Sequence, residues 1–239
     1  MIKALEHSGQ AMGVQLRRHE IIANNLANLN TPGFQRVVAR VSDGAALAAT
    51  AADRVRPALR VESLPSTASG PLQATGNPLD AALVGEGYFL VETPRGERLS
   101  RDGGFALDAA GTLIHSSGHP VLADGGAVSI RGAASILADG SVLDDGRLVG
   151  RLTVVRPADG ARLEREGDNL LRVAGDVETV PEGETSVLAG HLEGANVQAV
   201  QEMVDMIRAF RAYEIAQRAA LAADDTLRIA TERVGVVRA

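Results

Sequence analysis

The stretch Asn24–Arg36, NNLANLNTPGFQR, marks the point where an N-terminal helix ends and a different kind of structure begins. Pro32 disfavours a helical conformation at Thr31, and Gly33 lets the chain turn out of the helix. This stop signal leaves the asparagines of the stretch unexplained, because asparagine is a poor helix former. The same stretch therefore sets the helix boundary and raises a question about what the amides bind.

The asparagines cluster on the last turns of the predicted helix. Asn24 and Asn28 are four residues apart, and Asn25 and Asn28 are three apart, which places them in a polar strip beside Leu26. A buried amide in a seam between helices fixes the register at some cost in stability. Our hypothesis is that Asn24, Asn25 and Asn28 make hydrogen bonds between helices or between subunits. The alternative is a solvated polar helix end.

Upstream of this stretch, residues 2–29 contain no proline and show a helical pattern. The apolar positions recur at intervals of 7, 4, 7 and 3 residues, which indicates a seam like that of a coiled coil. Gly9 and Gly13 lower the helix propensity of this segment. The predicted stripe consists of Leu5, Met12, Leu16, Ala23 and Leu26.

The C-terminal segment predicts a second helix, from Val197 to about Arg233, with Asn196 as its cap. Its first half has an apolar stripe with intervals of 3, 4 and 3, beyond which the pattern changes to alanines and charges. The side chains of Glu202 and Asp205 are interpreted as a solvated charged face. The stripe consists of Val197, Val200, Val204 and Ile207, flanked by Met203 and Phe210.

The middle of the chain, residues 79–180, is typical of a β domain. It contains five Asp-Gly pairs, which are strong turn signals because glycine adopts positive φ without steric cost. Short apolar runs lie between these turns, as in an antiparallel all-β domain. Residues 35–78 are predicted to be an extended connector with strands near 35–41 and 58–62, and residues 181–195 a second connector.

The predicted fold class is α+β, with N- and C-terminal helices (1–34 and 196–239) paired as a coiled-coil-like unit around an inserted antiparallel all-β domain. We expect the two apolar stripes to face each other. An isolated pair of helices is only marginally stable in water, because burying one apolar stripe offsets little of the entropy lost on ordering the chain. The helices are therefore expected to need neighbouring subunits for full order.

Several function classes are disfavoured by composition. The net charge is −6 without a basic cluster, so we expect no nucleic-acid partner. The chain has no cysteine, and only 3% of its residues are aromatic, which argues against a small-molecule pocket. His115 and His119 have metal-like spacing, but Gly118 and Pro120 make the segment a turn. We therefore expect no metal, no cofactor, no catalytic residues and no enzymatic activity.

Three separate motifs resemble those of the bacterial flagellar basal-body rod protein family, within the wider group of rod, hook and hook-associated axial proteins. The first is ANNLAN followed by NTPGF, at residues 23–34. The second comprises GNPLD (76–80), GEGYF (85–89) and RDGGF (101–105). The third lies in the C-terminal helix, with Asn196-Val197, Glu202-Met203-Val204 and Arg211-Ala212-Tyr213-Glu214 in matching order.

This resemblance implies a structural subunit that assembles with itself and with other rod and hook proteins into the tube that transmits torque from motor to hook. It also implies export by the flagellar type III apparatus without a cleaved signal peptide, and a periplasmic location. No stretch of about 20 apolar residues occurs in the sequence, so we expect no membrane insertion. GRLTVV (150–155) and GDNLL (167–171) favour the proximal rod type, whereas RAYE (211–214) favours the distal type. A cell-envelope hydrolase is the alternative from another function class.

Two sets of residues are predicted to serve assembly. The residues expected at contacts between helices or subunits are Leu16, Asn24, Asn25, Leu26, Asn28, Val200, Val204, Ile207 and Tyr213. The residues expected to form the turn after the first helix are Thr31, Pro32, Gly33 and Phe34.

Overall fold

The computed structural model describes residues 2–43, 59–124, 126–181 and 183–236. These residues form two compact units, and the chain passes between them at four points. The helical unit consists of described residues within 1–27, 37–64 and 198–239, and the β unit of those within 28–36 and 65–197. The predicted α+β class, with terminal helices that pair and an inserted antiparallel β domain, is confirmed.

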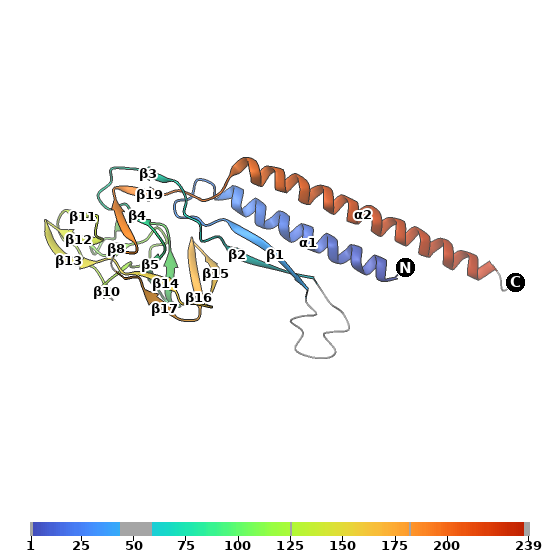
Figure 1. The fold of residues 1–239 in the computed structure, drawn as a ribbon, viewed down its shortest axis with the longest axis horizontal. Helices are drawn as coiled ribbons and strands as arrows, with labels where there is room; N and C mark the ends of the chain where they lie inside the picture. Colours follow the sequence, from blue (N-terminus) through green and yellow to red (C-terminus); the bar gives the residue numbers. More distant parts are fainter. Residues whose placement is uncertain (1, 44–58, 125, 182, 237–239) are drawn as a thin grey trace. The chain divides into compact units, whose positions relative to one another are not determined.

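Two antiparallel helices build the helical unit: α1 (Ile2–Ala27) and α2 (Ala199–Val236) lie side by side, with the start of α1 and the end of α2 at the same end of the pair (Figure 1). The first backbone hydrogen bond of α2 runs from the Glu202 N–H to the Gln198 carbonyl at 3.0 Å. Gln198 therefore precedes the helix, and the prediction that Asn196 caps it is wrong. Neither described helix is long and apolar enough to cross a membrane.

The side of α2 that faces α1 differs from the predicted stripe. Its members are buried or half-buried and recur at alternating intervals of four and three residues, the spacing of a heptad seam. Most are alanines, which let two helices approach closely. They are Glu202, Met206, Ala209, Tyr213, Ala216, Ala220 and Ala223. The expectation that the two large-residue stripes face each other is therefore wrong, since Val200 is 76% exposed and Ile207 54% exposed.

The predicted stripe of α1 is also only partly internal. Among the described side chains of α1, Val14, Ile21 and Asn25 are buried, and none of them belongs to the predicted stripe, whereas Leu16, a stripe residue, is 54% exposed. Met12, Ala23 and Leu26 are half-buried, at the margin of the covered face. Both helices carry apolar residues on more than one side, so periodicity alone did not identify the seam.

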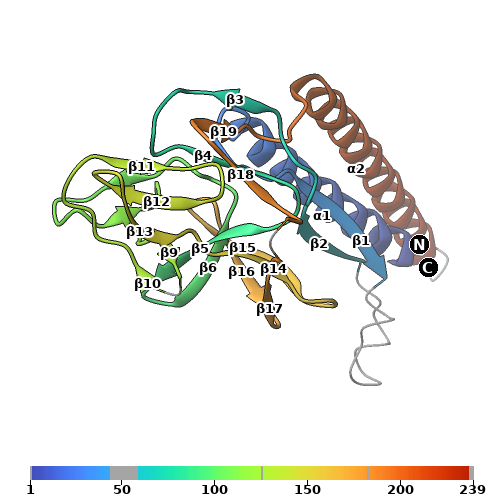
Figure 2. The ribbon, with the colours of Figure 1, turned by 60° about the vertical axis from the view of Figure 1, so that its left-hand side comes forward.

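A two-stranded ribbon completes the helical unit. It consists of β1 (Val37–Asp43) and β2 (Leu59–Pro65), and β1 lies along α1 (Figure 2). The strands fall near the two positions that the sequence predicted within residues 35–78. Val37 is buried in the unit, whereas Val38 and Val41 are exposed.

The β unit contains one six-stranded antiparallel sheet with the order β15-β16-β6-β5-β14-β17 and one three-stranded sheet with the order β11-β12-β13. Its strands in these two sheets are β5 (Tyr88–Thr93), β6 (Gly96–Ser100), β11 (Ala134–Ile136), β12 (Ser141–Asp144), β13 (Arg147–Arg151), β14 (Val154–Pro157), β15 (Arg162–Gly167), β16 (Leu170–Ala174) and β17 (Val177–Thr179).

Short strand pairs surround these sheets, in the combinations β18-β4, β19-β3, β7-β8 and β10-β9. Their strands are β3 (Leu72–Ala74), β4 (Ala81–Val84), β7 (Ala106–Leu107), β8 (Leu113–Ile114), β9 (Leu122–Ala123), β10 (Gly126–Ala127), β18 (Ser186–Ala189) and β19 (His191–Glu193). Pairing of β18 with β4 and of β19 with β3 joins the end of the β unit to its beginning.

The β unit contains two large apolar clusters, besides a smaller one around Phe34. One is centred on Phe89, whose ring meets that of Phe105 edge-on at 5.1 Å, and the other on Leu99 and Val155. The glycines of three Asp-Gly pairs adopt positive φ, at Gly140, Gly146 and Gly160, which agrees with their predicted role in turns.

Candidate assembly site

The chain segments that follow α1 and precede α2 lie side by side in the β unit. The Gly33 N–H donates to the Glu193 carbonyl at 2.6 Å, and the Asn196 N–H donates to the Phe34 carbonyl at 3.3 Å. The Asn196 side chain accepts from the Arg36 N–H and donates to the Ser66 and Ala68 carbonyls. Asn196 thus ties three segments together, which explains why it does not cap α2.

At Gly33 the turn motif packs directly against the backbone of Arg101 and Asp102, within the β unit. Its φ is +65°, and a Cβ atom at this position would lie 2.2 Å from the Asp102 backbone nitrogen and 2.4 Å from the Arg101 carbonyl carbon. Both of these atoms belong to the backbone, so a change of side-chain rotamer could not relieve the clash. Glycine is needed here for close approach as well as for backbone conformation.

Phe34 fills the space behind this turn. It is buried with Ala195 and Val197, and the Arg165 guanidinium lies 4.0 Å from the centre of its ring. Alongside, the Pro32 carbonyl accepts a 2.7 Å hydrogen bond from the Asn169 side chain. The turn predicted from Thr31, Pro32, Gly33 and Phe34 is therefore also a docking element.

A buried ion pair lies beneath the turn. Arg101 Nη1 is 3.2 Å from Glu193 Oε2, and each side chain is only 3% exposed. Arg101 also donates to the Gly85 carbonyl at 2.7 Å, with its guanidinium 5.4 Å from the centre of the Tyr88 ring. Glu193 Oε1 accepts from the Gly70 N–H at 2.8 Å. Burial raises the pKa of Glu193, and the charge of Arg101 opposes that rise.

Asn25, in the helical unit, is one of the asparagines whose binding partners the sequence left open. Its side chain is fully buried and binds both backbone groups of Val37, donating to the carbonyl at 2.9 Å and accepting from the N–H at 2.8 Å. The amide thereby makes the two hydrogen bonds that a neighbouring strand would otherwise make with the first residue of β1. Asn25 Nδ2 also donates to Glu202 Oε2 at 3.2 Å, which is a hydrogen bond between helices.

Glu202 is fully buried, so the interpretation of Glu202 and Asp205 as a solvated charged face is wrong for Glu202. Sequence reasoning missed this because a glutamate in a long helix is usually exposed. A signal was available, since Glu202 begins the alternating spacing that continues through Met206 and Ala209. Asn25 and Glu202 thus link α1 to α2 beside Val37, at the start of β1.

The other predicted asparagines have different surroundings. Asn24 is exposed on α1. Asn28 belongs to the β unit, where its side-chain oxygen accepts from the Thr31 hydroxyl at 3.2 Å and its carbonyl accepts from the Thr31 N–H at 3.1 Å. Its role is therefore to shape the turn after α1.

Replacing Asn25 with alanine is expected to lower the free energy of unfolding of the helical unit by about 2–4 kcal/mol. The substitution leaves the Val37 N–H and carbonyl without their amide partner, and each unsatisfied buried group costs about 1–3 kcal/mol. Thermal unfolding followed by circular dichroism at 222 nm measures the loss. Asn30→Ala, at an exposed site, is the control and should change stability by less than about 0.5 kcal/mol. Equal effects of the two substitutions would contradict the assigned role.

The described residues contain no group of three or more metal-ligating side chains. His115 is 1% exposed, and its two ring nitrogens lie 2.9 Å from the Ser100 and Ser117 hydroxyls. Burial lowers the pKa of His115, which favours the neutral ring. This arrangement stabilises the loop between β8 and β9 and gives no access to a substrate.

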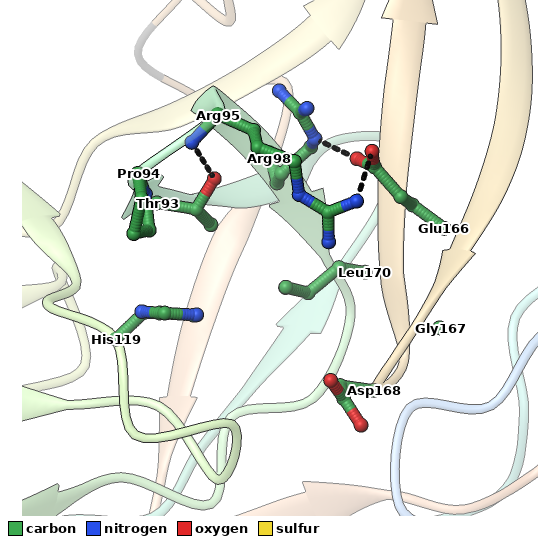
Figure 3. A pocket seen from close by; sticks show the side chains of 9 residues that line it. All are labelled: Thr93, Pro94, Arg95, Arg98, His119, Glu166, Gly167, Asp168 and Leu170. Atoms are coloured by element: carbon green, nitrogen blue, oxygen red, sulfur yellow. Dashed lines mark hydrogen bonds and ion pairs between the residues drawn. The ribbon is translucent and has the colours of Figure 1, made fainter.

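A shallow pocket of about 150 Å³ lies between the β5–β6 and β15–β16 turns (Figure 3). The guanidinium groups of Arg95 and Arg98 both bind the Glu166 carboxylate, in the case of Arg95 at 3.0 Å. These charges lower the pKa of Glu166, with the hydrogen bond from Arg98 as the main cause. The two arginines neutralise the Glu166 carboxylate, and the arrangement presents no nucleophile with an adjacent base.

Three segments of the chain match families of known proteins. Residues 5–35 match the family described as flagella basal body rod protein. Residues 82–148 match the flagellar hook protein FlgE/F/G D1 domain, and residues 188–233 the flagellar basal body rod FlgEFG protein C-terminal family. The flagellar basal-body rod protein FlgF of Caulobacter vibrioides is 35% identical, in an alignment that covers 96% of this chain and 97% of that protein. The chain belongs to the flagellar basal-body rod protein family.

Rod proteins of both named types are similar to it. The flagellar basal-body rod protein FlgG of Agrobacterium fabrum is 31% identical over 98% of this chain and 100% of its own length. The FlgF protein of Escherichia coli is 31% identical over 88% of this chain and 89% of its own length. The family resemblance inferred from the three motifs is therefore confirmed.

The three segments that match flagellar rod and hook families each contribute to the buried site. Gly33 lies in the first segment, Arg101 in the second, and Glu193 in the third. Sequence reasoning found the motifs but did not assign Arg101 and Glu193, which are 92 positions apart. Their one sequence signal was the position of Arg101 at the head of RDGGF. In this rod protein the motifs are brought together in space, around one ion pair and one glycine.

Proposed function

We propose that this protein is a structural subunit of the flagellar rod that binds its neighbours through the outer faces of its helical unit. Family membership supports the role, and the exposed apolar side of α2 carries the proposal. We define the outer α2 face as Val200, Met203, Val204, Ile207 and Phe210. Their exposed fractions range from 38% to 76%. Five large apolar side chains within three helical turns form a patch suited to burial by another protein.

The predicted contact residues divide between the two sides of the helices. Val200, Val204 and Ile207 lie on the outer α2 face, and Leu16 is exposed on α1, so all four are available to neighbouring subunits. Tyr213 and Leu26 are half-buried. Asn25 is already bonded within the chain, so its proposed contribution is to hold the helices that present the outer faces.

Partners and location complete the proposal. The subunit assembles with copies of itself and with other rod and hook proteins into a tube that transmits torque from motor to hook. It reaches the periplasm through the flagellar type III export apparatus without a cleaved signal peptide. We favour the proximal rod, because GRLTVV and GDNLL resemble that type and the FlgF protein of Caulobacter vibrioides is 35% identical. Its position in a reconstructed basal body would distinguish proximal from distal.

The substitution Ile207→Asp tests the proposal. Ile207 is exposed, so the free energy of unfolding of the isolated chain should change by less than about 0.5 kcal/mol. In cells whose own copy has been deleted, the variant should be exported but should fail to enter basal bodies and to restore swimming. Basal bodies are purified and probed for the chain.

Leu148→Asp is the matched control, because Leu148 is a 61% exposed apolar residue of the β unit. This variant should enter basal bodies and support swimming. Normal incorporation of Ile207→Asp would contradict the use of the outer α2 face in assembly. Absence of even the unaltered chain from basal bodies would contradict the proposed function itself.

A further inference from the structure

Two glycines on α1 have no explanation in the contacts of the described residues. Gly9 and Gly13 are exposed, and a Cβ atom added at either would meet no described atom within 4 Å. Neither has positive φ, so the helix would accept alanine at both sites. Glycine inside a helix lowers its stability relative to alanine. The absence of side chains here therefore costs stability without any compensating contact in the described part of the chain.

The glycines are four residues apart, so they share one side of α1. Glu6, Arg17 and Glu20 are exposed on the same side, with Arg17 2.9 Å from Glu20. We call these five residues the outer α1 face. Its middle carries no side chain at the two glycine positions, with Glu6 before the glycines and the Arg17–Glu20 ion pair after them.

The outer α2 face has the opposite character. It presents large apolar side chains, ending in Ile207 and Phe210, and continues on the same side into the exposed basic residues Arg211 and Arg218. Large side chains that project from one helix need a groove on the other, and the distance between helix axes depends on the residues at the contact. A helix surface with glycines allows the closest approach.

We propose that the outer α2 face of one copy packs on the outer α1 face of a second copy. This inference rests on the proposed role as an assembling subunit and names the surface that covers the outer α2 face. Ile207 and Phe210 would lie over Gly9 and Gly13, and Arg211 would approach one of the two flanking carboxylates. The choice of a second copy of this chain follows from this complementarity of shape and charge.

The two faces belong to different helices of the same unit, so the contact is heterologous. When two copies bind, one still has a free outer α1 face and the other a free outer α2 face. Further copies can therefore add in one direction, unless the rotation between copies closes a ring. Such an interface suits a growing tube. It also explains why α2 has two faces, one rich in alanine for its own α1 and one with larger residues for the neighbour.

The double substitution Gly9→Ala/Gly13→Ala separates this proposal from a purely intramolecular view of the helix. Alanine favours helix, so the melting temperature of the purified chain should stay the same or rise. Incorporation into basal bodies, in cells lacking their own copy, should nevertheless fall at least tenfold, because the added methyl groups keep the two copies apart. Gly126→Ala is the matched control, since a Cβ there also meets nothing within 4 Å, and it should incorporate normally.

A charge exchange provides the second measurement. Arg211→Glu should lower incorporation severalfold, and adding either Glu6→Arg or Glu20→Arg should restore it. If the glycine double variant is incorporated at the unaltered level, or if neither exchange restores Arg211→Glu, the proposed pairing is wrong. In both cases the outer α2 face would pack on another rod protein, and the structural role would stand. Loss of incorporation by Ile207→Asp reports on that role separately.

Discussion

Replacing Gly33 with alanine is expected to lower the free energy of unfolding by about 2–5 kcal/mol. Two costs combine. A residue with a side chain at φ +65° is strained by about 1–2 kcal/mol. In addition, the new Cβ would lie 2.2 Å from a backbone nitrogen, and such overpacking costs about 1–3 kcal/mol or more. Chemical denaturation followed by far-ultraviolet circular dichroism measures the change.

Gly76→Ala separates the two costs. Gly76 has φ +73°, close to that of Gly33, but a Cβ there meets nothing within 4 Å. This control should lose only the strain, about 1–2 kcal/mol. The difference between the two variants then gives the cost of separating the turn from Asp102. Equal losses would show that Gly33 is needed for its conformation alone and that the close approach contributes nothing.

Replacing Arg101 with methionine is expected to destabilise the β unit by about 3–5 kcal/mol, because it leaves the Glu193 carboxylate buried without its cation. The loss should depend on pH. Burial already raises the pKa of Glu193 above its unfolded value, and removing Arg101 takes away the charge that opposes this rise. A carboxyl group with a raised pKa favours the folded state most at low pH, and that contribution is lost as pH rises. The variant should therefore be closer to the unaltered protein near pH 4.5 than at pH 7.5.

The double variant Arg101→Met/Glu193→Gln is the control for this effect. Glutamine keeps an acceptor for the Gly70 N–H but carries no charge, so the double variant should be more stable at pH 7.5 than Arg101→Met alone. It should also lose most of the added pH dependence. A double variant that is as unstable as Arg101→Met, with an unchanged pH profile, would contradict the view that the buried charge causes the loss.

Much of the fold was predictable from local patterns. The proline-glycine stop after α1, the Asp-Gly turns of the β unit and the order of helix, β domain and helix all follow from backbone preferences that act within a few residues. The candidate site was only partly predictable. NTPGF identified the turn, but its binding partners Glu193 and Asp102 are distant in sequence and carry no pattern that links them to Gly33.

The sequence by itself determined the two helices, their pairing, the β domain between them and membership in the rod-protein family. The tertiary structure decided which side of each helix is internal. Val200 and Ile207 formed the clearest apolar stripe and are exposed, whereas Glu202 is buried against Asn25. The physical reason is that periodicity reports which residues avoid water and not what covers them. In a subunit that assembles, some apolar faces are covered by the chain itself and others are left for its neighbours.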